Sequence, residues 1–177
     1  MENTFDYLKR RAYDELLAWK NDLSDKTALL IEGARRVGKT SLIRRFVEKE
    51  YESFIYIDFS EKGRAVRAYK NAFAQCENVA DLLQRFQILS GVTLIPGRSC
   101  IVIDEVQLIP ELLFEVHSLM EKNPGPQFIL TGSSARKLKR TGTDLLGGRA
   151  LKLNMHPFTA HELGDSFSLE DALQYGM

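Results

Sequence analysis

A glycine-rich segment followed by a lysine and a threonine carries the most specific chemistry in the sequence. Residues 33–40 read Gly-Ala-Arg-Arg-Val-Gly-Lys-Thr and match G-x-x-x-x-G-K-[ST] at every fixed position. Gly33 and Gly38 let the backbone curl so that its N–H groups point at an anionic phosphate. Lys39 can then reach the β- and γ-oxygens, and the Thr40 hydroxyl can ligate Mg²⁺. The segment therefore predicts a site for the phosphates of a nucleoside triphosphate.

The surroundings of this segment favour the same interpretation over a strand-to-helix turn that merely contains glycine. An apolar run precedes it and an amphipathic segment follows it, so the positive end of a helix faces the bound phosphates. The residues that we expect to contact the nucleotide are Gly33, Ala34, Arg35, Arg36, Val37, Gly38, Lys39, Thr40 and Ser41.

Two adjacent carboxylates follow a second apolar run, residues 100–103. In an open parallel sheet, ligands bind outside the carboxyl ends of the strands, so Asp104 should lie near the phosphate loop. There it can hold Mg²⁺ together with Thr40, directly or through a water. Glu105 can orient and polarise a water for attack on the γ-phosphate. A solvated acidic turn is the alternative, and the preceding phosphate loop makes the metal-and-water interpretation the stronger one.

Polar residues and an arginine near two further strands are weaker candidates. Ser133 follows the apolar run 128–130, and its hydroxyl can sense the γ-phosphate or hold the attacking water. A hydroxyl-rich turn or helix cap explains the same residue equally well, so both interpretations stay open. Arg149 precedes the run 151–155 and can offset charge that develops in the transition state, from the same chain or from a neighbour. A surface arginine is the alternative.

A basic run extends from Arg136 to Arg140. It can contact nucleic acid, although a solvated face explains it more simply. His117, His156 and His161 lack ligand spacing with a cysteine or with one another, which favours structural roles for all three.

Apolar runs alternate with segments of helical spacing, which predicts right-handed crossovers and a mainly parallel sheet with helices on both faces. This is a three-layer α-β-α fold. The expected strands are 28–31, 54–59, 101–103, 128–130 and 151–155. One helix is expected around Leu8 to Trp19, before the first strand, and a second directly after the phosphate loop. Three more are expected over 65–73, from the N-cap Asn78 to Gly91, and from Pro110 onward.

The overall composition indicates a globular protein with no global attraction to polyanions. The 177 residues carry zero formal net charge, and 44% are hydrophobic. Cys76 and Cys100 lack metal-ligand spacing, and Cys100 should be a buried small hydrophobe. No apolar run approaches a membrane span, and the charged residues 1–11 do not resemble a signal peptide. We therefore expect a cytoplasmic protein without a membrane partner.

Taken in order, these motifs resemble the AAA-type P-loop ATPase module of a widespread bacterial and archaeal family that carries an uncharacterised C-terminal domain. The order of the motifs is more specific than any one of them. They are Tyr7-x-x-Arg10 with Trp19, residues 31–40, residues 103–107, residues 130–134, Gly147-Gly148-Arg149 and residues 157–163.

The resemblance implies a P-loop fold of the additional-strand, catalytic-glutamate branch, with five strands in the order 5-1-4-3-2. Residues 33–40 then correspond to its Walker A motif and Asp104 with Glu105 to its Walker B pair, while Ser133 falls in its sensor motif and Arg149 matches its arginine motif. It further implies one ATPase domain over 1–177, with a lead-in at 1–26, a nucleotide-binding core at 27–160, and a tail at 161–177 toward a further domain.

Three functions are compatible with these residues. Glu105 favours an ATPase, slow in isolation, that drives or switches a partner domain and self-associates through Arg149. The basic run Arg136–Arg140 leaves open an ATP-regulated nucleic-acid-binding module. A small-molecule kinase fits less well, because Glu105 is present and no lid is recognisable. The expected preference for adenine over guanine rests on the resemblance and on the absence of an N-K-x-D motif.

Overall fold

The computed structural model describes residues 10–22, 28–109, 112, 116, 125–132, 150–159 and 162. In chain order the elements are α1 (Arg11–Asn21), β1 (Ala28–Glu32), α2 (Lys39–Glu50), β2 (Ser53–Asp58), α3 (Arg64–Gln75), α4 (Val79–Ser90), β3 (Ser99–Asp104), the 3-10 helix η2 (Val106–Leu108), β4 (Gln127–Gly132) and β5 (Ala150–Asn154).

The five strands form one sheet in the order β2-β3-β4-β1-β5, and every neighbouring pair is parallel. Read from the other edge, this is the predicted order 5-1-4-3-2, so the predicted fold class is confirmed. The phosphate loop follows β1, and the acidic pair stands at the end of β3. In the sheet these two strands are separated by β4 alone. Their carboxyl ends therefore open on the same edge of the sheet.

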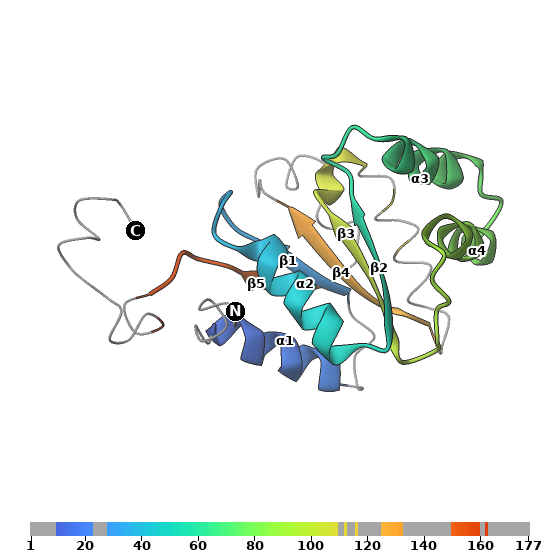
Figure 1. The fold of residues 1–177 in the computed structure, drawn as a ribbon. Helices are drawn as coiled ribbons and strands as arrows, with labels where there is room; N and C mark the ends of the chain where they lie inside the picture. Colours follow the sequence, from blue (N-terminus) through green and yellow to red (C-terminus); the bar gives the residue numbers. More distant parts are fainter. Residues whose placement is uncertain are drawn as a thin grey trace, which may run out of the picture.

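Helices cover both faces of the sheet, as Figure 1 shows: α1 and α2 lie on one side, and α3 and α4 lie on the other. Alternate residues of β1 serve the two cores, because successive side chains of a strand point to opposite faces. Leu29 and Ile31 belong to the cluster under α1 and α2, while Leu30 belongs to the cluster under α3 and α4. The central strands are thus buried on both faces, as their unbroken apolar runs predicted.

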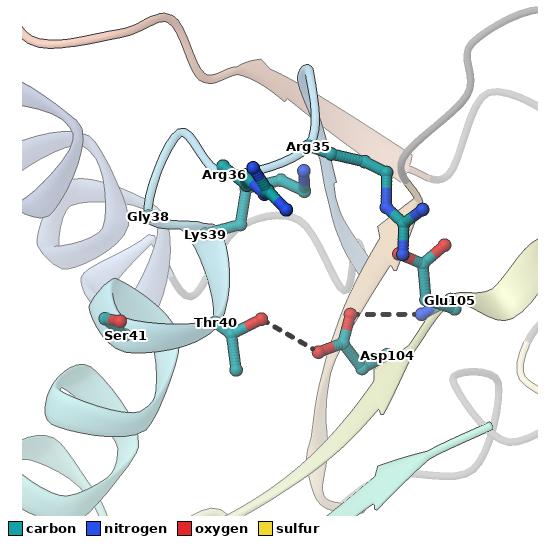
Figure 2. Close-up of a pocket in the computed structure, with 8 residues that line it drawn as sticks. All are labelled: Arg35, Arg36, Gly38, Lys39, Thr40, Ser41, Asp104 and Glu105. Carbon is teal, nitrogen blue, oxygen red and sulfur yellow. Dashed lines mark hydrogen bonds between the residues drawn. The ribbon is translucent and has the colours of Figure 1, made fainter. Parts of the chain in front are cut away.

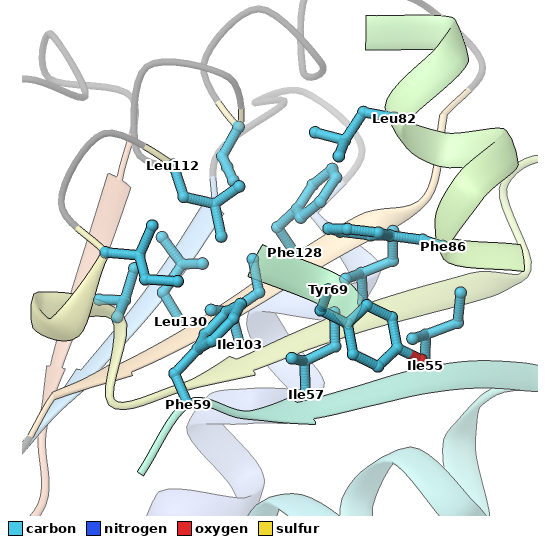
Figure 3. Close-up of a cluster of buried hydrophobic side chains, with 14 of the residues drawn as sticks. Ile55, Ile57, Phe59, Tyr69, Leu82, Phe86, Ile103, Leu112, Phe128 and Leu130 are labelled. Atoms are coloured by element: carbon cyan, nitrogen blue, oxygen red, sulfur yellow. The ribbon is translucent and has the colours of Figure 1, made fainter. Parts of the chain in front are cut away.

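The core under α3 and α4 is built from aromatic and aliphatic side chains (Figure 3). Tyr69 of α3 and Phe86 of α4 meet edge-to-face with ring centroids 5.3 Å apart. Leu112 and Val116 are also buried in this cluster. The remainder of the helix predicted from Pro110 onward lies outside the described residues.

Helix boundaries follow the capping chemistry of the sequence. Asn78 accepts hydrogen bonds from the backbone N–H groups of Ala80 and Asp81 at the start of α4, and Gly91 ends that helix with φ of 69°. Both ends were predicted. At Thr159 and Glu162 the backbone N–H groups and side chains bond reciprocally, which is a capping box. Among the helices that the structure describes, none is long and apolar enough to cross a membrane.

Candidate functional site

The loop between β1 and α2 wraps around the side chain of its own lysine (Figure 2). Lys39 Nζ donates hydrogen bonds of 2.8 Å to the carbonyl oxygens of Gly33 and Ala34. Arg36 and Gly38 have positive φ angles of 68° and 88°, and these bend the chain into the first turn of α2. The loop thus holds the Lys39 ammonium group through two of its own carbonyl oxygens.

Lys39 is only 7% exposed although it carries a charge. Burial lowers the pKa of Lys39 from its ordinary value, and Glu105 and Asp104 act in the opposite direction by attracting the proton. A desolvated ammonium group held by two neutral carbonyls is poised to exchange them for anionic oxygens, because charge-assisted hydrogen bonds are the stronger ones.

Gly33 stands against the end of β5. A Cβ atom built at this position would lie 2.3 Å from the carbonyl oxygen of Met155, which is closer than atoms can approach. Met155 is itself held, since its N–H donates to Glu32 O at 2.7 Å. Glycine is therefore required at position 33 by packing against β5 as well as by the close approach of phosphate to the loop backbone.

We expect Gly33→Ala to lower the free energy of unfolding by roughly 1–3 kcal/mol, because the added methyl group forces the loop away from β5. Gly63→Ala is the matched control, since a Cβ there meets nothing closer than 3.9 Å. Urea unfolding of both variants without nucleotide measures the difference. Equal unfolding free energies for the two variants would show that the contact between Gly33 and Met155 is not tight.

Asp104 ends β3, is 4% exposed, and contacts Thr40. Thr40 Oγ1 donates a hydrogen bond of 3.1 Å to Asp104 Oδ2, as Figure 2 shows. Two oxygen-bearing side chains from α2 and β3 thus meet beside the phosphate loop. The structure brings together the two residues that were predicted to hold Mg²⁺.

Two further hydroxyl groups hold the Asp104 carboxylate. Tyr56 of β2 donates to Oδ2 at 2.7 Å, and Thr131 of β4 donates to Oδ1. Burial, together with the hydrogen bond to Asp104, raises the pKa of Tyr56 above its ordinary value, so the phenol keeps its proton at neutral pH. Neither residue was singled out from the sequence for this contact. The only signal for this contact in the sequence was the alternation along β2, which places Tyr56 on the opposite face of the strand from Ile55 and Ile57.

We expect Thr131→Val to cost about 1–3 kcal/mol of stability, because the shape is kept while a buried carboxylate loses a donor. Thr131 is fully buried, and its hydroxyl also accepts the N–H of Glu105 at 3.2 Å. Thermal or denaturant unfolding measures the change. An unfolding free energy within about 0.5 kcal/mol of the wild-type value would mean that the hydroxyl contributes nothing measurable.

Glu105 has a backbone conformation that side chains rarely adopt, with φ of 57°. Its N–H donates to Asp104 Oδ1 at 3.1 Å and to Thr131 Oγ1, and these bonds hold the residue in place. Gln107 Nε2 donates to Glu105 Oε2. Figure 2 shows the Arg35 side chain pointing toward the Glu105 carboxylate. Such strained residues cluster at functional sites, which fits the predicted role of Glu105.

These side chains surround a pocket of about 590 Å³ at the carboxyl edge of the sheet. Its volume lies within the range typical of small-molecule sites. The pocket is lined by Arg35, Arg36, Gly38, Lys39, Thr40, Ser41, Asp104 and Glu105. All eight were predicted site residues. Gly33 and Ala34 contribute the carbonyl groups behind it, and Val37 packs into the core.

The remaining predicted site residues fall outside the part of the chain that the structure describes. They are Ser133, Arg149 and the basic run Arg136–Arg140. Their proposed contacts with phosphate, a neighbouring chain or nucleic acid stay predictions. Neither Cys76 nor Cys100 forms a disulfide, and Cys100 is fully buried, as predicted.

Comparisons with known proteins show the family and the fold of this chain. A family model described as an AAA domain matches residues 25–164. The Orc1 protein of Aeropyrum pernix, solved in complex with DNA, is similar with a TM-score of 0.57 and 18% identity over 96% of this chain and 50% of that one. A Walker-type ATPase of Pyrococcus abyssi is similar with a TM-score of 0.55 and 21% identity over 90% and 57%. The chain spans about half the length of these two proteins. Among curated proteins, a search finds no match.

Proposed function

The chain belongs to a family of AAA domains, and we propose that it binds ATP with Mg²⁺ in the pocket beside Lys39 and hydrolyses it slowly. One observation carries the proposal. Lys39, Thr40, Asp104 and Glu105 come from three elements and line the same pocket. These are the residue types that phosphate binding, metal binding and water activation require.

The loop binds the phosphates in this proposal. Its backbone N–H groups and the N-terminal end of α2 face the β- and γ-phosphates, while Lys39 leaves the carbonyl oxygens of Gly33 and Ala34 for phosphate oxygens. The helix contributes the positive end of its dipole to the same anions.

Thr40 and Asp104 fit Mg²⁺ by their chemistry. Mg²⁺ prefers hard oxygen ligands and is usually held by one or two protein groups together with phosphates and water. Thr40 Oγ1 and Asp104 Oδ2 are such oxygens, 3.1 Å apart at the pocket. When bound, the ion would neutralise charge that develops on the phosphate oxygens.

Glu105 orients the attacking water toward the γ-phosphate and accepts a proton from it. Its carboxylate lies at the pocket, and the hydrogen bond from Gln107 to Oε2 fixes the orientation of the group. From the pocket this carboxylate can contact the water.

In this proposal the biological function of the protein also depends on segments outside the nucleotide-binding core. Residues 27–160 are proposed as the nucleotide-binding core, with 161–177 leading toward a further domain that ATP drives or switches. Ser133 as sensor and Arg149 as a charge-offsetting residue, with self-association through Arg149, belong to the same proposal.

A second candidate function is an ATP-regulated nucleic-acid-binding module. The Orc1 protein of similar fold was solved with DNA, and this chain has the basic run Arg136–Arg140. Binding of DNA or RNA should then weaken with salt and with charge removal in that run. If no salt-dependent binding occurs at low ionic strength, this function is excluded.

The products formed from ATP test the proposed function. Incubation with Mg·ATP should release free phosphate and ADP without any added acceptor. Transfer of the γ-phosphate to a small acceptor molecule, with no free phosphate, would instead identify a kinase and contradict the proposal.

A further inference from the structure

The Asp104 carboxylate accepts hydrogen bonds from four donors. Oδ2 receives the hydroxyl groups of Thr40 and Tyr56, and Oδ1 receives the Thr131 hydroxyl and the Glu105 N–H. The group therefore has a single orientation, which is fixed from α2, β2, β4 and the residue that follows β3.

Tyr56 holds this carboxylate from the next strand. In the sheet Tyr56 pairs with Val102 and Asp58 pairs with Asp104, so Asp104 lies two residues beyond the register partner of Tyr56 and on the same face of the sheet. The Tyr56 ring is fixed by Arg44, whose guanidinium carbon lies 4.4 Å from the ring centroid. Arg44 and Thr40 lie four residues apart on α2, hence on one face of the helix.

We propose that Tyr56 is a positioning residue for the magnesium site, acting through Asp104. Its hydroxyl keeps Oδ2 turned toward Thr40, so that the Thr40 proton is committed to Asp104 and the Thr40 oxygen lone pairs are free for the metal. The inference rests on the proposed binding of Mg·ATP and concerns the metal alone. The phosphates meet the loop and Lys39, which Tyr56 does not support.

The test is Tyr56→Phe, which removes one hydroxyl and keeps the ring under Arg44. The probe is a fluorescent ATP analogue, titrated with Mg²⁺ and also measured in EDTA. We expect the Mg²⁺ concentration for half-maximal binding to rise about tenfold, as the loss of a hydrogen bond to a charged group implies. Binding in EDTA should stay at the wild-type level.

Tyr13→Phe is a closely matched control. The Tyr13 hydroxyl also donates to a carboxylate, Glu50 Oε1 at 2.9 Å, and a lysine lies over its ring. Tyr13 belongs to α1 and is not among the residues that line the pocket. Its variant should lose stability without any change in the Mg²⁺ requirement.

The outcomes separate the inference from the proposed function. If the wild-type protein shows no Mg²⁺-dependent binding, the proposed function fails. If it does, and Tyr56→Phe needs no more Mg²⁺ than Tyr13→Phe, the positioning role is wrong. An equal loss of binding in Mg²⁺ and in EDTA would also overturn it, because a general structural defect affects both.

A separate set of contacts concerns Arg10, a buried arginine with 7% exposure. Its Nη2 donates to Val37 O of the phosphate loop at 2.7 Å and to His156 O at 3.2 Å. Its guanidinium lies 3.8 Å from the centroid of the Phe158 ring. One side chain thus joins the loop to the segment after β5.

Glu162 extends the same cluster. Arg10 Nη1 faces Glu162 Oε2 at 3.9 Å and donates no hydrogen bond to any described residue. Glu162 also accepts the N–H groups of Arg11 and Thr159 at 3.0 and 2.9 Å. The start of α1 and the first turn after β5 are therefore joined at this carboxylate.

We also infer that Arg10 transmits the state of the phosphate loop to residues 156–159 and Glu162. The loop loses two internal hydrogen bonds when Lys39 exchanges carbonyl oxygens for phosphate, and Val37 O lies in that loop. A change there shifts the Arg10 guanidinium against His156 and Phe158. By linkage, order in this segment must alter nucleotide affinity by the same factor. This inference also rests on the proposed ATP binding.

Hydrogen exchange of residues 155–159 with and without Mg·ATP tests this coupling. In the wild-type protein, nucleotide should slow exchange in the segment. In Arg10→Gln saturated with nucleotide, the nucleotide-dependent change in the segment should be lost. Arg11→Gln is the control, since the Arg11 side chain is 89% exposed. Retention of the wild-type response in Arg10→Gln, or its absence from the wild-type protein with nucleotide bound, would contradict the coupling.

Discussion

Glu105→Gln is expected to reduce ATP turnover by roughly 10²- to 10⁴-fold, the range typical for loss of a general base. Glutamine keeps the size of the side chain and can still accept a hydrogen bond, but it cannot take the proton of the attacking water. Affinity for Mg·ATP should change little, because Lys39 and Thr40 remain. Phosphate release at saturating ATP, together with a binding titration, measures the two effects separately.

Asp58→Asn is the matched control for this loss. Asp58 ends the neighbouring strand, and its carboxylate accepts the N–H of Ser60 at 2.8 Å instead of lining the pocket. Asparagine can keep that contact, so turnover should stay at the wild-type level. If Glu105→Gln hydrolyses ATP as fast as Asp58→Asn, Glu105 does not activate the water.

Lys39→Ala is expected to weaken nucleotide binding by about a hundredfold, as the loss of charged hydrogen bonds to phosphate implies. The Gly33 and Ala34 carbonyl groups that Lys39 now holds would turn to solvent, so the unliganded loop also loses its internal support. The binding isotherm of ATP in Mg²⁺, measured for variant and wild type, gives the ratio.

Lys49→Ala controls for the loss of a positive charge from the same helix. Lys49 is exposed in the last turn of α2, far along the helix from the pocket. Its variant should bind nucleotide as the wild type does. Equal affinities for Lys39→Ala and wild type would show that the pocket beside Lys39 is not the phosphate site.

The local part of the site could be predicted because its chemistry lies within short segments of sequence. The loop from Gly33 to Thr40 fixes its own turn and the start of α2, and the buried run before Asp104 fixes where the acidic pair emerges. A parallel sheet then brings both to one edge. The strands agree with prediction to within about two residues at each end, which is the usual limit for such boundaries.

The contacts that hold the site in place required the sheet order and register. Tyr56 can reach Asp104 only because β2 and β3 are neighbours with Asp58 opposite Asp104. Arg10 reaches His156 across 146 residues of sequence, which no local pattern encodes. Thr131 stood at a predicted strand end, yet its bond to Asp104 depends on the pairing of β3 with β4. Long-range pairing decides such partners, and spacing along one chain does not reveal it.

Titration of the wild-type protein with ATP, in Mg²⁺ and in EDTA, tests the central claim most directly. The proposed site predicts one saturable site per chain, with tighter binding when Mg²⁺ is present, because Thr40 and Asp104 would hold the ion against the phosphates. A parallel titration with GTP reports the base preference. Absence of saturable ATP binding in Mg²⁺, or the same affinity in Mg²⁺ and EDTA, would contradict the proposal that this pocket is a magnesium-dependent ATP site.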